Sequence, residues 1–386
     1  MVRWGVPRER QGDERVALVP EALAALKGAG HEVVLEGGAG AGAGYGDEAY
    51  AAQGGTVAAR ADVLACDLVT TIGPPGPEDL EALRPGALLV GMLAPLTDPG
   101  LAARLAARGV NAFSLELVPR ITRAQGMDVL SAMSTVSGYR AVLDAATLAR
   151  RFFPMLMTAA GTLTPARVLI LGAGVAGLQA IATARRLGAV VEAFDAREAA
   201  REQVESLGAT FLGLPPLEGG GEGEGGYARA MAADEEARER EFLAPAVARA
   251  DVVITTAQVP GRRAPLLIDE AMALGMRPGS VIVDLAADTG GNCALTAAGE
   301  TVRRGPVTLF GPSNPAAAMP RPASQLYTRA LGAFVAHLGT AGVPVPAPAQ
   351  APPLPDDAIV RGAALVWGGA VVHEATRRRL EEEAHA

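Results

Sequence analysis

One segment of the sequence, residues 167–195, constrains the fold of this chain more than any other. It reads RVLILGAGVAGLQAIATARRLGAVVEAFD. An apolar run typical of a buried strand leads into three glycines, Gly172, Gly174 and Gly177, which open an amphipathic helical pattern. A second apolar run then ends at Asp195. This strand–turn–helix–strand arrangement, with its G-x-G-x-x-G spacing, is the fingerprint of a dinucleotide-binding unit.

Each position of the fingerprint has its own physical reason. Gly172 permits a tight turn, Gly174 lets the backbone approach a pyrophosphate, and Gly177 lets the helix pack closely on the strand. Free N–H groups at the start of the helix attract phosphates. A carboxylate at Asp195 favours NAD(H) over NADP(H), because it accepts hydrogen bonds from the adenosine ribose and repels a 2′-phosphate. Three neighbours are expected to share in the site: Ala173, Val175 and Ala196, together with Arg197, which could instead accommodate a phosphate.

Strand-like and alanine-rich helical runs alternate through most of the chain, which indicates parallel sheets covered on both faces. The expected strands are 3–6, 32–35, 68–71, 88–91 and 111–114, then 167–171, 190–194, 210–212, 252–255, 281–284 and 307–310. Because the pattern restarts near residue 165, we expect an α/β chain of two Rossmann-like domains. The predicted division is 1–136 plus 322–386, and 137–321, with the C-terminal segment returning to the first domain.

Three helical or loop segments bear on this organisation. Residues 127–157 are expected to form one helix, broken near Phe153-Pro154, and residues 324–338 a buried helix followed by a Pro/Ala linker. The glycine-rich run 37–46 is typical of a flexible loop. A second glycine-rich run, 219–226, precedes a charged helical stretch and fits a linker or a lid equally well.

A second group of candidate ligand-binding residues follows the predicted strand 252–255. Thr256, Ala257 and Gln258 come directly after it, at the carboxyl edge where open α/β sheets bind ligands. Gln258 fits an exposed loop side chain equally well.

The composition excludes several classes of protein. The chain has 386 residues, a net charge of −8, one lysine among 34 basic residues, four histidines and two cysteines. Lys27 lies in an amphipathic run typical of a surface helix, so Schiff-base chemistry is disfavoured. The spacing of cysteine and histidine fits no zinc site, and two distant cysteines give no disulfide framework. An acidic chain without a basic tract is a poor nucleic-acid binder. We expect neither a secretory signal nor direct membrane insertion, since glycine and proline break the longest uncharged window, 330–355.

Several segments resemble the alanine dehydrogenase/nicotinamide nucleotide transhydrogenase superfamily. They are GVPRERQGDERVALVPEALAALKGAGHEVVLE, the fingerprint above, ITTAQVPGRRAPLLIDEAM and MRPGSVIVDLAADTGGNC. The segment VPRITRAQGMDVLSAMS is similar to a loop of the NAD(H)-binding component of proton-translocating transhydrogenase. The resemblance implies that Arg120 and Ser131 hold the nicotinamide end, that Gln125 hydrogen-bonds the nicotinamide ribose, and that Asp128 orders the loop.

Two further segments are similar to the same branch. GGYARAM resembles the family's mobile loop, which implies that Gly226, Tyr227 and Met231 close over bound nucleotide and favours the lid interpretation of the second glycine-rich run. LPDDAIVRGAALVW, residues 354–367, resembles the junction that precedes membrane helices in longer homologues.

The dehydrogenase branch is the main alternative, as a soluble NAD-dependent amino-acid dehydrogenase. The resemblance places its substrate lysine near Thr71 and its histidine near Ala94, and neither is present. Without them, proton transfer has no agent. An arginine that grips the substrate carboxylate in that branch falls in the segment containing Arg8 and Arg15. A non-enzymatic NAD-sensing module is a further alternative, which leaves the Arg120–Gln125–Asp128 set without a purpose.

The resemblance therefore implies direct hydride transfer between two nicotinamides, a reaction that needs placement rather than acid–base groups. The sequence contains one fingerprint, so we expect NAD(H) in the cleft between the two domains and NADP(H) on another polypeptide. The implied partners are an NADP(H)-binding beta subunit, a membrane-spanning subunit and a second copy of this chain. The implied location is the cytoplasmic face of a membrane, reached through those partners, with hydride transfer coupled to proton translocation.

Overall fold

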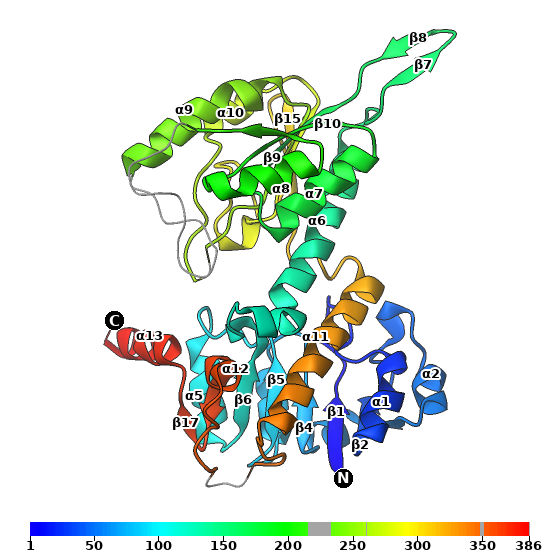
Figure 1. Ribbon diagram of the computed structural model, residues 1–386, viewed down its shortest axis with the longest axis vertical. Helices are drawn as coiled ribbons and strands as arrows, with labels where there is room; N and C mark the ends of the chain where they lie inside the picture. The colour runs from blue at the N-terminus through cyan, green and yellow to red at the C-terminus, as the bar shows by residue number, and fades with distance from the viewer. Residues whose placement is uncertain (215–232, 260, 348–350, 386) are drawn as a thin grey trace. The chain divides into compact units, whose positions relative to one another are not determined.

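The computed structural model describes residues 1–214, 233–259, 261–347 and 351–385. The chain divides into two compact units, one formed by Met1–Met133 with Ala317–Ala386 and the other by Ser134–Ala316. Each has its own sheet and its own helices (Figure 1). The α/β class with mainly parallel sheets that the sequence predicts is confirmed.

The sheet of the first unit has eight strands in the described residues, in the order β17-β16-β6-β5-β4-β1-β2-β3. Their bounds are β1 Val2–Val6, β2 His31–Glu36, β3 Thr56–Ala58, β4 Leu68–Thr70, β5 Leu88–Gly91, β6 Asn111–Ser114, β16 Ala364–Trp367 and β17 Ala370–Val371. Strands β1 to β6 pair in parallel, whereas β16 is antiparallel to β6. The C-terminal part of the chain therefore completes the sheet that the N-terminal part begins.

Helices cover this sheet, and their bounds are η1 Pro20–Ala22, α1 Leu23–Gly28, η2 Ala41–Ala43, α2 Asp47–Ala52, α3 Arg60–Leu64, α4 Pro77–Ala82, α5 Pro99–Ala107, η3 Leu115–Leu117, η4 Thr122–Met127, α11 Pro320–Thr340, α12 Ala358–Ala363 and α13 Glu374–His385. The longest of them, α11, lies across one face of the sheet (Figure 1). Its Tyr327 and Phe334 are fully buried, and the Phe334 ring meets the Phe113 ring edge-on at 5.8 Å between centroids.

The sheet of the second unit has the order β11-β10-β9-β12-β13-β15-β14. Its strands are β9 Arg167–Leu171, β10 Val190–Phe194, β11 Thr210–Leu212, β12 Val252–Thr255, β13 Ser280–Asp284, β14 Thr301–Arg304 and β15 Val307–Phe310, and its helices are α7 Val175–Arg186, η5 Glu198–Ala200, α8 Arg201–Ser206, α9 Ala233–Arg249, α10 Glu270–Leu274 and η7 Ala287–Thr289. Both faces of the sheet are buried: Ile170 joins a core with Ala180 of α7, and Leu169 joins a core with Leu243 of α9.

Counted in chain order within the unit, the six parallel strands of the second sheet lie in the order 3-2-1-4-5-6. The first six strands of the other sheet have the same order. In such a sheet the connections run in opposite directions from strand 1 and strand 4, so a crevice opens between their carboxyl ends. In the second unit that point lies between β9 and β12, and in the first between β1 and β4.

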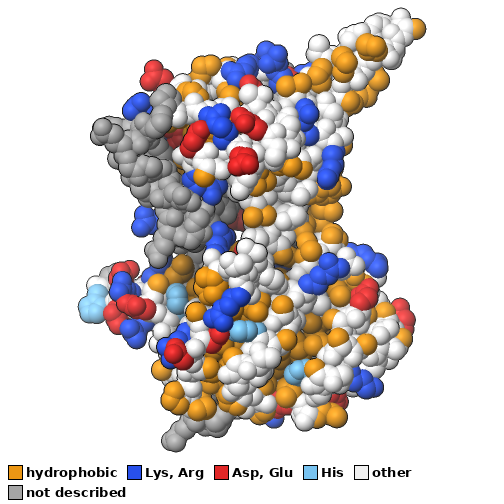
Figure 2. Space-filling view, viewed as in Figure 1, with side chains coloured by type: hydrophobic (Ala, Val, Ile, Leu, Met, Phe, Trp, Pro, Cys, Tyr) orange, Lys and Arg blue, Asp and Glu red, His pale blue; other side chains and the backbone are white. Residues whose placement is uncertain are grey.

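The expected helix over 127–157 is wrong in its second half. Helix α6, Val129–Leu148, ends before Phe153-Pro154, and a hairpin of β7, Leu156–Thr158, and β8, Gly161–Leu163, follows. This hairpin projects from its unit (Figure 1), and hydrophobic and uncharged side chains line it (Figure 2). Met155, Met157 and Leu163 are 59%, 71% and 51% exposed. A tight hairpin of exposed side chains carries no burial pattern that distinguishes it from a helix end.

Strands β3, β14, β16 and β17 were not predicted from the sequence. Strands β3 and β17 are short and poorly buried edge strands, and β14, with the sequence TVRR, is mostly exposed. Such strands lack the continuous apolar runs by which buried strands are found. No helix among the described residues is long and apolar enough to cross a bilayer.

Candidate functional site

The glycine turn after β9 has a tight backbone with one open side. Gly172 has φ +99°, and a Cβ there would lie 2.6 Å from the Thr256 hydroxyl oxygen. A Cβ on Gly177 would lie 1.8 Å from the carbonyl oxygen of Gly172, so α7 packs on the turn at a distance that only glycine allows. A Cβ on Gly174 would meet no heavy atom within 4 Å. Two glycines are thus required by packing, whereas the third borders open space.

Helix α7 presents its N-terminus to this open space. Its N-cap residue is Gly174, in extended conformation, and no side chain caps the helix. The first N–H groups of a helix have no intrahelical partner and carry positive potential. Ala173 is buried in the turn, while Val175 is 41% exposed at the first helical position. Uncapped N–H groups beside an open glycine fit a pyrophosphate.

Asp195 follows β10 and lies against the turn. Its Oδ2 accepts hydrogen bonds from the backbone N–H of Ala173 at 2.7 Å and from Arg197 Nη2 at 3.0 Å. Its Oδ1 accepts from the backbone N–H and from Nε of Arg197, both at 2.9 Å. Ala196, between them, is partly buried. The Arg197 guanidinium therefore forms a two-pronged ion pair with Asp195, although the sequence left open that it takes a phosphate.

A second acidic residue, Glu239, faces this region and was not predicted. It lies in α9 and is 5% exposed. Burial, and next the negative charge of Asp195 and of Glu236, raise the pKa of Glu239 to about 7, against the opposing charge of Arg240. In the sequence it is hidden in the charged run DEEARERE, where no spacing marks one carboxylate as buried.

The loop after β12 meets the glycine turn at the crevice between strands 1 and 4. The N–H of Thr256 donates to the carbonyl oxygen of Leu171 at 2.8 Å, and its hydroxyl donates to that of Gly172 at 3.1 Å. Ala257 is partly buried, and Gln258 is exposed with its Nε2 donating to the carbonyl oxygen of Leu285 at 2.7 Å. The structure thus places Thr256 and Ala257 beside the turn and gives Gln258 an exposed position with one anchoring hydrogen bond.

The Arg120 loop lies in the first unit, where it surrounds a cavity of about 470 Å³. The cavity is lined by Pro119, Arg120, Ile121, Thr122, Ala124, Gln125, Asp128 and Ser131. Asp128 precedes α6, and its carboxylate accepts from the Ser131 N–H at 2.8 Å and from the Ser131 hydroxyl at 2.6 Å. Arg120 and Gln125 are exposed. The four residues singled out from the sequence therefore share one hollow, in a different unit from the glycine turn.

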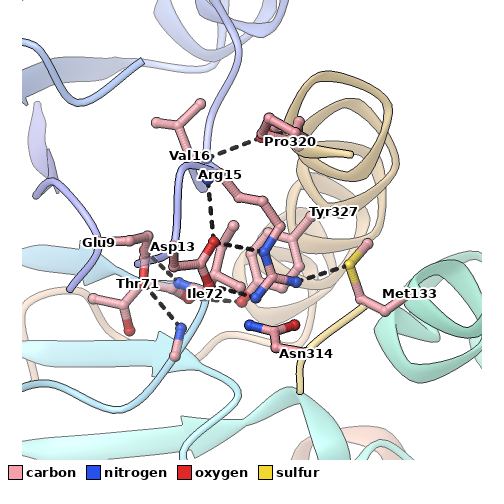
Figure 3. A network of polar contacts seen from close by, with 12 residues as sticks. Glu9, Asp13, Arg15, Val16, Thr71, Ile72, Met133, Asn314, Pro320 and Tyr327 are labelled. Atoms are coloured by element: carbon pink, nitrogen blue, oxygen red, sulfur yellow. Dashed lines mark hydrogen bonds and ion pairs between the residues drawn. The ribbon is translucent and has the colours of Figure 1, made fainter. Parts of the chain in front are cut away.

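The crevice of the first unit, between β1 and β4, holds the chain's own side chains (Figure 3). Glu9 accepts hydrogen bonds from the N–H groups of Ile72 and Gly73 at 2.7 and 3.1 Å, and burial raises its pKa to about 7. The Tyr327 hydroxyl donates to the carbonyl oxygen of Thr71 at 2.6 Å. Thr71 itself is 5% exposed, and its hydroxyl has no hydrogen-bond partner among the described residues.

Arg15 belongs to the same network. It is 3% exposed and pairs with Asp13, Nη2 to Oδ2 at 2.5 Å and Nε to Oδ1 at 2.8 Å, while its Nη1 lies 3.3 Å from Met133 Sδ. Arg8 is exposed. The positions where the dehydrogenase branch has its lysine and histidine hold Thr71 and Ala94, and Ala94 has φ +53° with its N–H donating to Glu116 at 2.7 Å.

Three of the predicted residues, Gly226, Tyr227 and Met231, lie outside the described residues. The other candidate residues fall into two sets. The second unit brings together the glycine turn, Asp195, Arg197 and the Thr256–Ala257 loop. The first unit brings together Arg120, Gln125, Asp128 and Ser131.

Comparison with known proteins gives matches along nearly the whole chain. The family "Alanine dehydrogenase/PNT" matches with its N-terminal domain over residues 5–137 and its C-terminal domain over residues 141–374. The chain is 42% identical over 383 residues to an NAD(P) transhydrogenase subunit alpha of Rhodospirillum rubrum, covering 97% of this chain and 98% of that one. A solved transhydrogenase structure from Sinorhizobium meliloti aligns with TM-score 0.84 and 38% identity over 97% of this chain and 100% of that one. An alanine dehydrogenase of Bacillus subtilis is 29% identical over 98% of this chain and 95% of that protein.

Proposed function

The chain belongs to the alanine dehydrogenase/PNT family, and on that premise we propose that it is the NAD(H)-binding subunit of a proton-translocating nicotinamide nucleotide transhydrogenase. Its relatives are transhydrogenase subunits, which implies oxidoreductase activity and nicotinamide nucleotide binding. One observation carries the choice within the family. A complete glycine turn with an acidic partner lies in a chain whose dehydrogenase positions hold Thr71 and Ala94.

The residues of this chain bind and orient the nucleotide. When bound, NAD(H) exchanges a hydride with NADP(H) held by a partner, which requires no proton transfer from a side chain. The N–H groups at the start of α7 hold the pyrophosphate, and Asp195 accepts from the adenosine ribose and disfavours a 2′-phosphate. Ala173, Val175 and Ala196 shape the turn, and Thr256, Ala257 and Gln258 line the crevice beside it.

The loop of the first unit handles the nicotinamide end in this proposal. Arg120 and Ser131 hold the nicotinamide and Gln125 hydrogen-bonds its ribose. Asp128 fixes Ser131 through two hydrogen bonds, so it acts as a positioning residue. Gly226, Tyr227 and Met231 close over the nucleotide and exclude water. The rate then depends on placement, because well-oriented reactants gain about 7–11 kcal/mol over free encounter.

The assembly is included in the proposal. A relative named "subunit alpha" implies partner subunits. We assign this chain to a homodimer that docks, through an NADP(H)-binding beta subunit and a membrane-spanning subunit, on the cytoplasmic face of a membrane. Hydride transfer is then coupled to proton translocation by those partners.

An amino-acid dehydrogenase is the competing assignment. It needs a group that takes up a proton at the substrate nitrogen. Thr71 and Ala94 cannot do so, and the buried Arg15 is already paired with Asp13. The alanine dehydrogenases are also the more distant relatives, at 29% identity.

The decisive experiment compares the chain with and without partner subunits. We expect the purified chain to bind NADH, seen by quenching of protein fluorescence or by calorimetry, and to show negligible hydride transfer from NADH to an NADP⁺ analogue. Adding the beta and membrane subunits should restore transfer. Rapid transfer by the chain alone, or NAD-dependent oxidation of alanine, contradicts the proposal.

A further inference from the structure

The loop that follows β12 is held by an amide side chain that lies 35 residues away in sequence. We propose that Asn292 is a positioning residue of the nucleotide site, which fixes the backbone of Ala257 against the glycine turn. This inference rests on the proposed function only in taking the crevice between β9 and β12 as the nucleotide site. Asn292 itself is fully buried and touches the site through the loop.

The side chain of Asn292 pairs with both polar groups of the Ala257 backbone. The Ala257 N–H donates to Oδ1 at 3.1 Å, and Nδ2 donates to the Ala257 carbonyl oxygen at 2.9 Å. The second hydrogen of Nδ2 goes to the carbonyl oxygen of Pro265 at 2.8 Å. A carboxamide has one acceptor and two donors in a plane, so it imitates a peptide group of a neighbouring strand.

A substitute for a strand is needed at this position. The pairing between β12 and β13 ends with Thr255 opposite Asp284. Ala257 lies two residues beyond, where β13 no longer provides partners, yet it is partly buried. A buried backbone group without a partner costs about 1–3 kcal/mol. The Asn292 amide meets that need and thereby fixes the course of the loop.

Asn292 is itself held rigidly by Asp284, at the end of β13. Asp284 is 1% exposed, and its Oδ2 accepts from the N–H groups of Asn292 and Cys293 at 2.8 and 3.1 Å and from the Thr296 hydroxyl at 2.7 Å. Gly291, with φ +75°, makes the turn, and a Cβ there would lie 2.9 Å from Asp284 Oδ2. The backbone thus has one course by which Asn292 reaches Ala257.

The fixed loop in turn contacts the glycine turn. Thr256 precedes Ala257 and bonds to the carbonyl oxygens of Leu171 and Gly172, as described above. Loss of the Asn292 amide would release Ala257, and with it the residue that lies nearest to Gly172. The effect belongs to nucleotide affinity, because the released segment borders the crevice rather than the centre of the sheet.

The test uses Asn292→Ala and Asn292→Asp, the second of which keeps the acceptor for the Ala257 N–H and loses both donors. We expect each to raise the dissociation constant for NADH about tenfold. In hydrogen exchange followed by mass spectrometry, residues 256–259 should exchange faster in both variants, while residues 252–255 of β12 stay protected. Asp251→Asn is the matched control.

Asp251 is 7% exposed, precedes β12 at the opposite edge of the same sheet, and accepts from the Arg167 N–H at 2.8 Å. Asp251→Asn should lower the melting temperature and leave NADH affinity within about twofold. If either folded Asn292 variant keeps NADH affinity within about twofold with unchanged exchange, the assignment fails. A fast-exchanging Ala257 amide in the unchanged protein overturns it too, whether or not the variants fold. An unchanged protein that does not bind NADH contradicts the proposed function instead, while the exchange measurement still decides the role of Asn292.

Discussion

Asp195 and Arg197 act as one structural group, because four hydrogen bonds tie the carboxylate to the arginine and to the glycine turn. The carboxylate supplies the acceptors and the charge that select a nucleotide without a 2′-phosphate. The arginine is oriented by that same carboxylate. Removal of the carboxylate therefore changes two things, since it also frees a guanidinium that binds phosphate well.

We expect Asp195→Ala to weaken NADH binding about tenfold and to narrow the preference over NADPH, since Arg197 becomes available to the 2′-phosphate. Titration with both nucleotides measures the two dissociation constants. Glu198→Ala is a suitable control, because Glu198 is an exposed neighbour that pairs with Arg201. Unchanged NADH affinity in Asp195→Ala would remove Asp195 from the site.

Glu239 gives a second prediction at the residue scale. Its pKa is raised to about 7 in the folded chain, whereas an unfolded glutamate titrates near 4.5. The folded state therefore holds a proton that the unfolded state loses, so stability is full below pH 4.5 and declines as the pH rises through 7. Glu239→Gln keeps the neutral form, and at pH 8 it should raise the free energy of unfolding by about 2–3 kcal/mol.

Thermal melts at pH 5 and pH 8 test this prediction. The gain in melting temperature should be larger at pH 8 than at pH 5. Glu241→Gln, which replaces an exposed carboxylate on the same helix, should show no such difference. An equal effect of Glu239→Gln at both pH values contradicts the raised pKa.

Residues whose role is set by local spacing could be predicted from the sequence, and the others could not. The three glycines and Asp195 lie within one βαβ unit, so their separation along the chain fixes their separation in space. Arg120, Gln125 and Asp128 came from the resemblance, and the structure gathers them around one cavity. Asn292 and Glu239 depend on partners 35 and 44 residues away, and no local pattern reports such contacts.

The start of α7 is the element on which nucleotide binding depends most, and its two inner glycines differ in kind. Gly174 has φ −73° and open space beside it, so alanine fits its backbone. Gly177 lies against the carbonyl oxygen of Gly172. A methyl group at one position blocks ligand approach, and at the other it separates the helix from the strand.

We therefore expect a clean split between two alanine variants. Gly174→Ala should keep the melting temperature and raise the NADH dissociation constant about tenfold. Gly177→Ala should destabilise the second unit by about 2 kcal/mol or more, because α7 must move off β9. Calorimetry gives both quantities. A strongly destabilised Gly174→Ala, or a fully stable Gly177→Ala, would contradict the steric account.

Elements with continuous apolar runs were predicted well. Strands β9, β10, β11, β12 and β15 begin and end where the sequence predicts. The β7–β8 hairpin and strands β3, β14, β16 and β17 were missed, because exposed or short strands have no inward face to leave a period of two. Element type thus follows from burial, and the sequence is least informative where burial is least.

At the scale of the whole molecule, family membership and the α/β class were predicted and are confirmed. The scarcity of lysine, histidine and cysteine supports a reaction that needs placement only. The proposed homodimer depends on a surface. The β7–β8 hairpin has exposed Met155, Met157 and Leu163, and residues 152–166 carry no charge. An isolated two-stranded hairpin is marginal in water, so we expect a second copy of the chain to cover it.

Met157→Glu should then weaken self-association at least about tenfold, since it brings a charge into the centre of the contact. Analytical ultracentrifugation over a range of concentrations measures this. Leu274→Glu, at an exposed apolar position on α10 of the same unit, should leave the dimer intact. A Met157→Glu protein that dimerises as before shows that the hairpin is not the dimer contact, and a monomeric unchanged protein contradicts the homodimer itself.

The first unit is discontinuous in sequence, and this bears on how the chain is made. Its β6 gains its neighbour β16, and its core gains Tyr327 and Phe334, only from residues that follow position 316. The second unit, in contrast, is one uninterrupted stretch. On the ribosome, the later stretch can therefore reach its native state while the earlier one still waits for its last helix and strand. Synthesis runs from the N-terminus, but completion of the folded units runs in the reverse order.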